Sequence, residues 1–292
     1  MIAPTELSIS LPSLTLRAQA WGDPALPPLL ALHGWLDNAG SYALLAPLLA
    51  ERWRVIALEL PGHGHSDHLP AGVHYHFIDY VRAALAAADA LRLQRFALLG
   101  HSLGAGIAAL LAAAAPARIE SLHVIEGLGP IGDDGSHTLQ RFRDALMPQS
   151  STKRPLRLFR DVEQAISART IASGLRPELA RPIVERGLFE TSLPADDQSP
   201  ASSGWNWRSD PRLTRSTPLR IAENQIHALL RGIQAPTSLL LAQPTTPYLP
   251  SHPMQLRAAC VAHIKVSHMQ GCHHLHLEHP QAVADWLCQP SL

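Results

Sequence analysis

Ser102 has the surroundings in the sequence that most clearly suggest chemistry. It is the middle residue of Gly-His-Ser-Leu-Gly at 100–104, directly after an apolar stretch typical of a strand and directly before an Ala-rich stretch typical of a helix. A serine on a sharp strand-to-helix turn needs small residues two positions before and after it, because bulk there would collide with the neighbouring strand and helix. Gly100 and Gly104 meet that need. The pattern therefore predicts a nucleophile at Ser102, and the alternative is an ordinary glycine-rich turn.

A serine hydroxyl is a weak nucleophile at neutral pH, so a base must lie within hydrogen-bond reach. The sequence has 17 histidines, and three of them occur in GCHHLHLEHP at 271–280, between the last strand-like and the last helix-like segment. His273, His274 and His276 are all candidates on this evidence. A metal-binding tract is the alternative, but Cys or Asp at a matching ligand spacing is missing nearby, so we expect no metal.

Acyl transfer also needs donors for the negative charge that forms on the substrate oxygen. The peptide N–H of Leu103 is one expected donor, because it follows the serine and begins a helix, where the helix dipole favours an anion. The second is expected from ALHGWLDN at 31–38, where the N–H of Trp35 would point into the site. His33 is interpreted as a structural residue whose ring is satisfied by the backbone.

The elements that must position these residues alternate along the chain. Short apolar runs without clear polar alternation predict strands that are buried on both faces of a parallel sheet. Helical patterns separate them, which indicates an open α/β sheet with right-handed crossovers. The strand-like runs lie at 28–34, 54–60, 95–101, 121–127, 237–243 and 263–269, and the helix-like segments at 41–50, 78–91, 103–115 and 281–288.

The segment from 130 to 233 has a different composition, with more Arg, Ser and Pro and no strand-like run of useful length. We interpret it as a helical cap inserted into a core formed by residues 1–129 and 234–292. The cap is either a second helical layer that completes the core or a lid over the active site, and the two interpretations are compatible.

Composition limits the remaining possibilities. The chain has 292 residues, 46% of them hydrophobic, and 24 basic residues balance 24 acidic ones, so no net charge favours nucleic acid. Cys260, Cys272 and Cys288 lack a disulfide or metal spacing, and no apolar run is long enough to span a membrane. We therefore expect a cytoplasmic protein with reduced thiols and no membrane span, whereas the sequence leaves its oligomeric state open.

Five segments together carry a family resemblance. They are HGWLDNAGSY (33–42), ELPGHGHSDH (59–68), GHSLGAG (100–106), the softer match WNWRSDPRL (205–213) and GCHHLHLEHP (271–280). In order and spacing the chain resembles the α/β-hydrolase superfamily, and closely its serine hydrolase-like, kraken-type branch. The resemblance implies a mostly parallel, eight-stranded sheet with a helical cap after the sixth strand.

The resemblance also implies roles for particular residues. In related enzymes the catalytic histidine lies seven residues before the proline that opens the last helix, which selects His273. The acid usually follows the seventh strand, but the loop AQPTTPYLP at 242–250 has no carboxylate. We therefore predict Glu126, at the end of the sixth strand, as the acid of the triad, as in some haloalkane dehalogenases. Asp133 and Asp134 are the rivals.

The expected reaction follows from the residue at the turn. Similar haloalkane dehalogenases and epoxide hydrolases use an aspartate there, whereas this chain has Ser102, which points to acyl transfer to water without a cofactor. The expected substrates are small apolar acyl compounds: esters, thioesters or lactones. The alternatives are carbon–carbon bond hydrolysis and a non-catalytic ligand-binding protein of the same fold.

The expected substrate pocket is mostly apolar. Its predicted lining residues are Trp35, Leu103, Leu128, Trp205 and Trp207. As an alternative, Trp205 and Trp207 anchor the apolar core of the cap itself.

Overall fold

A computed structural model describes residues 2–146, 158–193, 202–246 and 249–289 of the protein. Its central feature is an eight-stranded sheet with the strand order β1-β2-β4-β3-β5-β6-β9-β10. The strands of this sheet are β1 (Thr5–Ser10), β2 (Thr15–Trp21), β3 (Pro28–Leu32), β4 (Arg54–Leu58), β5 (Phe96–His101), β6 (Ile119–Ile125), β9 (Thr237–Gln243) and β10 (Ile264–Gln270). The pairings β1–β2 and β2–β4 are antiparallel and the others are parallel, which is the mostly parallel α/β architecture that the sequence predicts.

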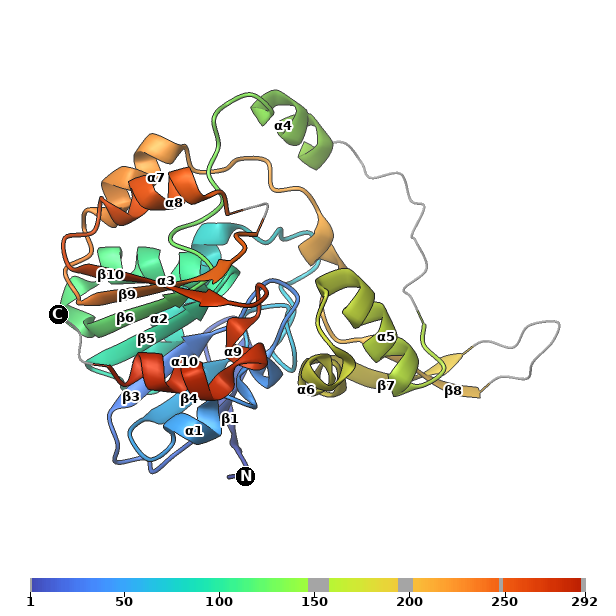
Figure 1. Ribbon diagram of the computed structural model, residues 1–292. Helices are drawn as coiled ribbons and strands as arrows, with labels where there is room; N and C mark the ends of the chain where they lie inside the picture. The colour runs from blue at the N-terminus through green and yellow to red at the C-terminus, as the bar shows by residue number, and fades with distance from the viewer. Residues whose placement is uncertain (1, 147–157, 194–201, 247–248, 290–292) are drawn as a thin grey trace.

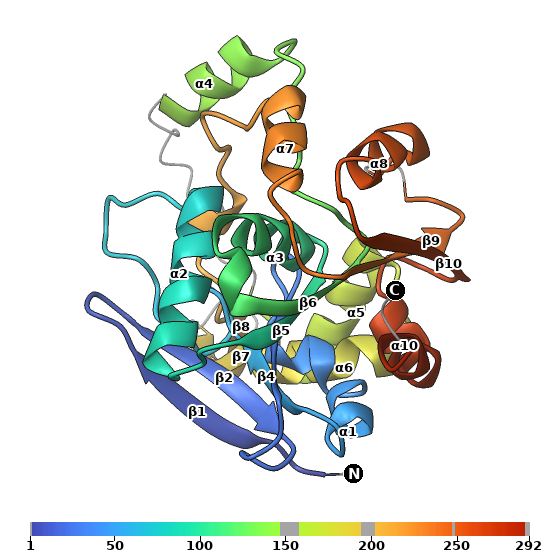
Figure 2. The same cartoon turned by 90° about the vertical axis from the view of Figure 1, so that its left-hand side faces the viewer.

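Helices cover both faces of the sheet (Figures 1 and 2). Because the central strands β3, β4 and β5 are buried from both sides, their sequences are continuous apolar runs rather than alternating ones. The helices are α1 (Ala46–Leu49), α2 (Phe77–Ala90), α3 (Leu103–Ala114), α4 (Thr138–Leu146), α5 (Val162–Ser173), α6 (Pro177–Gly187), α7 (Glu223–Leu230), α8 (Ser251–Ala258), α9 (Leu275–Glu278) and α10 (Pro280–Leu287). Short 3₁₀ turns are η1 (Ala39–Tyr42), η2 (Pro116–Arg118) and η3 (Pro211–Thr214). None of the helices in the described ranges is long and apolar enough to cross a membrane.

The helix expected over residues 41–50 is shorter than the sequence suggested. The structure has the 3₁₀ turn η1 followed by the four-residue helix α1. Pro47 lies in the first turn of α1, where a proline is tolerated because its missing N–H would have no partner within the helix. The helix therefore begins at Ala46, with Pro47 in its first turn, and does not continue the turn that precedes it.

The inserted segment contains a unit with an apolar cluster of its own. Helices α5 and α6 pack against each other and against the antiparallel strands β7 (Leu188–Leu193) and β8 (Ser202–Trp207). Figure 1 shows this unit beside the sheet core, with α4 lying apart from both. The description of 130–233 as helical is therefore incomplete, because it missed the hairpin. Alternating polar and aromatic residues in the short run SSGWNW are the strand signal that went unnoticed.

Helix α7 also lies within the predicted cap but packs on the core. Its buried residues Ile226 and Leu230 join the main core cluster, and the helix contacts α3. The part of the insertion that packs as a separate unit therefore ends before α7, earlier than residue 233.

A buried ion pair fastens this cap unit to the sheet core. Arg186 on α6 donates to Glu59, with its Nε 2.8 Å from Oε1 and a terminal nitrogen 3.0 Å from Oε2. Glu59 follows β4 and is completely buried, and Arg186 also reaches Glu6 on β1 at 2.8 Å. The position of α6 is thus fixed by charge as well as by apolar contact.

Replacing Arg186 by Ala should lower the free energy of unfolding by about 3–5 kcal/mol, because it leaves the Glu59 carboxylate buried without its partner. The matched control is Arg181→Ala on the same helix. Arg181 pairs with Glu163 and Glu185 at the surface, so its loss should cost less than about 1 kcal/mol. Urea denaturation of the two variants measures the difference, and equal small losses would contradict the anchoring role.

Candidate active site

Ser102 occupies the turn between β5 and α3 with a backbone geometry that is rare for a side-chain-bearing residue. Its φ is +53° and its ψ is −114°. The peptide N–H donates to the carbonyl of Ile125 on β6 at 3.0 Å, and its carbonyl accepts from the N–H of Gly106 at 3.1 Å. Such strained geometry persists only where surrounding contacts hold it. Here the neighbouring strand and the first turn of the helix hold it, and the side chain is left half-buried.

The two glycines around Ser102 allow this turn by permitting close backbone contact. A Cβ on Gly100 would lie 2.6 Å from the Cα of Ala105. A Cβ on Gly104 would collide with the end of β3, lying 2.8 Å from the carbonyl oxygen of His33. The small-residue requirement thus has a distinct steric cause on each side of the serine.

Glu126 and His273 lie in contact. Glu126 follows β6 and is 2% exposed, and its Oε2 lies 3.0 Å from Nδ1 of His273. The carboxylate also accepts hydrogen bonds from the N–H of Ala242 at 2.6 Å and from Oγ1 of Thr246 at 3.1 Å. A buried carboxylate with these donors can orient an imidazole and stabilise its protonated form. The ends of β6 and β9 supply this acid position together.

His273 lies in the loop between β10 and α9, next to the serine turn. Nε2 of His101 is 2.8 Å from the carbonyl of His273, and the two rings are 4.7 Å apart between centroids. Since His101 immediately precedes Ser102, the loop of His273 is held against the turn that carries the serine. Burial, together with Glu278, raises the pKa of the adjacent Cys272 thiol to about 11, so this thiol stays protonated and does not compete as a nucleophile.

The rival histidines have other contacts. Nε2 of His276 is 2.9 Å from Oγ of Ser41, and Nε2 of His274 is 3.5 Å from the carboxylate of Asp37. Both rings are buried, and burial lowers the pKa of His276 to about 3. In the structure, the ring of His273 is the one that contacts Glu126.

The rival acids lie in the segment that leads to α4. Asp133 pairs with Arg141 and accepts a hydrogen bond from Oγ1 of Thr138 at 2.6 Å. Asp134 accepts from the N–H and the hydroxyl of Ser136. Both carboxylates therefore serve local turns.

Backbone strain concentrates around these residues. Four residues other than glycine have a positive φ in the described ranges: Leu36, Arg92, Ser102 and Glu126. Three of the four belong to the candidate site, at the loop after β3, the serine turn and the acid position. Strained backbone is typical of sites where function fixes the geometry.

The loop after β3 carries the expected second oxyanion donor, Trp35. This residue is 52% exposed, and its indole N–H donates to the carbonyl of Leu213 in η3 at 3.3 Å, so the side chain lies against η3. The N–H of Asp37 closes the turn on the carbonyl of Gly34 at 3.2 Å. His33 is completely buried, and both of its ring nitrogens contact backbone groups, of Gly34 and Leu60.

A polar cluster that the sequence reasoning missed lies beneath this loop. Asp37, His101 and His274 present ligand-type atoms that lie within 4.8 Å of one another. Arg169 on α5 already pairs with Asp37, and a divalent cation would add buried positive charge beside that guanidinium. We therefore regard the group as a buried cluster of polar side chains paired with Arg169 rather than a metal centre. All three residues fall inside quoted motifs, at 33–42, 100–106 and 271–280, but nothing local indicated that they meet.

Three of the apolar residues predicted to line a pocket have packing contacts in the structure. Leu128 is completely buried in the main core. Trp205 and Trp207 pack against the apolar cluster of the cap, where the ring of Trp207 meets that of Phe159 edge to face at 5.2 Å. Trp205 also forms two backbone hydrogen bonds with Phe159. These contacts favour the alternative that the two tryptophans anchor the cap.

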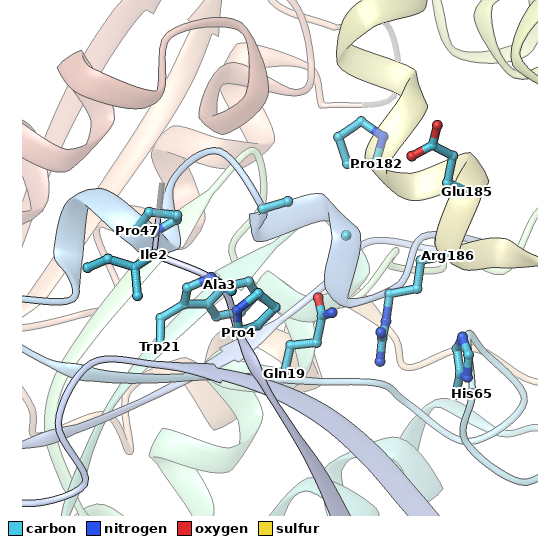
Figure 3. A pocket seen from close by; sticks show the side chains of 12 residues that line it. Ile2, Ala3, Pro4, Gln19, Trp21, Pro47, His65, Pro182, Glu185 and Arg186 are labelled. Carbon is cyan, nitrogen blue, oxygen red and sulfur yellow. The ribbon is translucent and has the colours of Figure 1, made fainter.

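An open groove of about 410 Å³ lies between the N-terminal segment, the start of α1 and the α6 helix (Figure 3). None of the predicted site residues lines it. The lining residues are Ile2, Ala3, Pro4, Gln19, Trp21, Gly40, Ala43, Pro47, His65, Pro182, Glu185 and Arg186. We assign the groove no part in the proposed chemistry.

Comparisons with known proteins agree with this architecture. A serine hydrolase-like protein from Danio rerio is 29% identical over 97% of this chain and 86% of its own length. A serine hydrolase-like protein from Dictyostelium discoideum is 28% identical over 95% of this chain and 79% of its own. The crystal structure of a hypothetical protein from Pseudomonas aeruginosa has a TM-score of 0.85 at 37% identity, with 96% of each chain covered.

A thioesterase domain from the curacin biosynthetic pathway has a TM-score of 0.82 at 25% identity, and the match covers 98% of this chain and all of that domain. The family model for the alpha/beta hydrolase fold matches residues 27–280, which is most of the sequence. The chain therefore belongs to the α/β-hydrolase fold family, and serine hydrolase-like proteins are among its relatives.

Proposed function

We propose that the protein hydrolyses small, uncharged carboxylic esters or related acyl compounds through a Ser102–His273–Glu126 triad. The observation that carries the proposal is the 3.0 Å contact between Nδ1 of His273 and the buried carboxylate of Glu126, formed beside the strained serine turn. Family membership and the serine at the turn agree with it.

In the proposed mechanism, Glu126 accepts a hydrogen bond from Nδ1–H of His273, which leaves Nε2 of the ring as the basic nitrogen. Oγ of Ser102 attacks the acyl carbon while Nε2 removes the hydroxyl proton. The imidazolium then gives this proton to the leaving alkoxide or thiolate, and an ester of Ser102 remains. Water, deprotonated by the same nitrogen, attacks the acyl-enzyme and releases the acid.

The charge on the carbonyl oxygen is stabilised by the peptide N–H groups of Leu103 and Trp35. Leu103 is the first residue of the 12-residue helix α3, whose dipole favours an anion at this end. Trp35 follows the strand against which Gly104 packs, so both donors approach the same region from two neighbouring elements.

Thioesters are the second candidate substrate class, because the similar thioesterase domain has the same fold at 25% identity. Matched oxygen-ester and thioester substrates with the same acyl chain separate the two classes. A panel of diketones tests carbon–carbon hydrolysis.

Replacing Ser102 by Ala should abolish covalent labelling by a fluorophosphonate probe and lower turnover of short p-nitrophenyl esters by about 10⁶-fold, because the acyl-enzyme cannot form. Gel fluorescence and intact-mass spectrometry measure the labelling, and circular dichroism checks the fold. Wild-type turnover in the variant would sink the proposal. A wild-type protein that binds apolar ligands without being labelled would favour the non-catalytic alternative.

Replacing His273 by Ala should lower turnover by about 10⁴- to 10⁶-fold, since no other ring contacts Glu126 among the described residues. The matched control is His279→Ala, which removes an exposed ring from the same segment and should leave turnover within about threefold of wild type. If His276→Ala lost as much turnover as His273→Ala with its fold intact, the base would be misassigned.

Replacing Glu126 by Gln should reduce kcat by about 10³- to 10⁴-fold, because an amide cannot stabilise the imidazolium and favours the wrong tautomer. Asp134→Asn tests a rival carboxylate and should change kcat by less than about threefold. Steady-state ester hydrolysis measures kcat of both variants. The assignment fails if the two variants lose activity to the same extent.

A further inference from the structure

Asp37 contacts side chains from several elements of the core and from the cap. It belongs to the loop after β3 and is 1% exposed. Arg169, on helix α5 of the cap, donates to its Oδ1. Its Oδ2 accepts from Oγ of Ser41 at 3.3 Å and lies 3.5 Å from Nε2 of His274 and 3.8 Å from Nδ1 of His101. The neighbours of these two histidines in the sequence are His273 and Ser102.

Charge in this cluster is balanced by the cap. Burial opposes ionisation of Asp37, but Arg169 and His274 outweigh it and hold the pKa of Asp37 well below its usual value. Burial and the neighbouring rings keep the pKa of His101 well below its usual value, and that of His276 at about 3, so both rings are neutral. The permanent positive charge that faces the Asp37 carboxylate is therefore the guanidinium of Arg169.

Arg169 also contacts the strained turn directly. Its second terminal nitrogen lies 3.5 Å from the carbonyl oxygen of Leu36, whose φ is +59°. The backbone of Gly34 packs on the same cluster, since a Cβ there would lie 3.1 Å from Oδ2 of Asp37 and 3.0 Å from Nδ1 of His101. The turn between Gly34 and Asp37 contains the Trp35 N–H. It is thus held by packing against the Asp37 cluster and by the contact with Arg169 of the cap.

The tautomer of His101 is fixed by the same arrangement. A carbonyl oxygen can only accept, so Nε2 of His101 donates to the carbonyl of His273, and Nδ1 carries a lone pair. That nitrogen is buried without a hydrogen-bond partner among the described residues and faces Asp37. The ionised carboxylate of Asp37 repels this lone pair. The guanidinium of Arg169, paired with the other carboxylate oxygen, offsets that repulsion.

We propose that Arg169 of the cap is a positioning residue. By neutralising Asp37, it holds two loops in place beside the Ser102 turn: the loop after β3, which carries the Trp35 N–H, and the loop that carries His273. The proposal rests on the function proposed above, because it concerns the geometry of that site. Arg169 does not touch the triad itself; it acts through Asp37 and Leu36. A consequence is that the cap takes part in turnover as well as in substrate access.

Arg169→Gln should lower kcat for p-nitrophenyl butyrate by about 10²-fold, with KM within about threefold, because displacement of the oxyanion loop weakens stabilisation of the transition state. The Asp37 carboxylate, no longer paired, should favour protonation of His101, whose Nδ1 lies 3.8 Å away and whose ring contacts that of His273. The acidic limb of the pH profile of kcat/KM should therefore move to higher pH, by about one unit.

Three further variants sharpen the test. Arg169→Lys should restore part of kcat, because it returns the charge without the planar fork. In the Asp37→Asn, Arg169→Gln double variant the acidic limb should return toward its wild-type position, because the unpaired carboxylate is gone. Arg181→Gln, which removes an exposed cap arginine, should leave both kcat and the pH profile unchanged. Thermal unfolding of every variant shows the fraction folded at the assay temperature.

The proposal is overturned if Arg169→Gln behaves like Arg181→Gln. It is also overturned if the loss lies entirely in KM and only for anionic esters, which would make Arg169 a substrate-binding group. A loss that follows the unfolded fraction, with an unshifted pH profile, would reduce Arg169 to a structural role. Failure of the wild type to hydrolyse esters or to label at Ser102 would instead refute the proposed function, so the two failures are distinguishable.

Discussion

The close approach of α3 to the end of β3 is the constraint on which the candidate site depends. At Gly104 the helix backbone passes so near the carbonyl groups of Leu32 and His33 that no side chain fits between them. That contact fixes the start of α3, with Leu103 and the serine turn, relative to the loop that continues from β3 to Trp35. The proposed nucleophile and both proposed oxyanion donors are therefore located by one steric contact, before any side chain of the site is considered.

This arrangement carries a conformational cost that the surrounding hydrogen bonds offset. Leu36, Ser102 and Glu126 adopt a backbone conformation with positive φ, which costs on the order of 1–3 kcal/mol each. Each is held from outside its own segment: Ser102 by the carbonyl of Ile125, and Glu126 by the carbonyl of Leu240 and the N–H of Ala242. Leu36 is held by Arg169. The strain is thus distributed over contacts from β6, β9 and the cap, and this couples the site to the packing of the whole molecule.

Sequence reasoning predicted the parts of this structure that depend on local pattern. Apolar runs located the central strands, and the glycines around Ser102 located the turn, because both effects act between residues near one another in the chain. The hairpin β7–β8 was missed because its strands mix polar and apolar residues, unlike the apolar runs of the central strands. The helix expected over 41–50 was too long because Pro47, which a helix tolerates only in its first turn, lies in the middle of that range. The Asp37–Arg169 contact joins residues 132 positions apart and could not be found from spacing alone. Trp205 and Trp207 were ambiguous for the same reason, since an apolar residue looks alike whether it lines a pocket or anchors a cap.

The two buried ion pairs of the cap differ in what they hold. Arg186 joins α6 to Glu59 after β4, and Arg169 joins α5 to Asp37 in the loop after β3. The apolar cluster of the cap also includes Leu277, which lies four residues after His273. A displacement of α5 and α6 would therefore break both ion pairs and would also move the loop that carries His273. We therefore expect substitutions in β7 and β8 to be tolerated more readily than substitutions on the faces of α5 and α6 that carry these contacts. If the cap shapes the acyl site as proposed, changes that suit another acyl group should be found in the hairpin first.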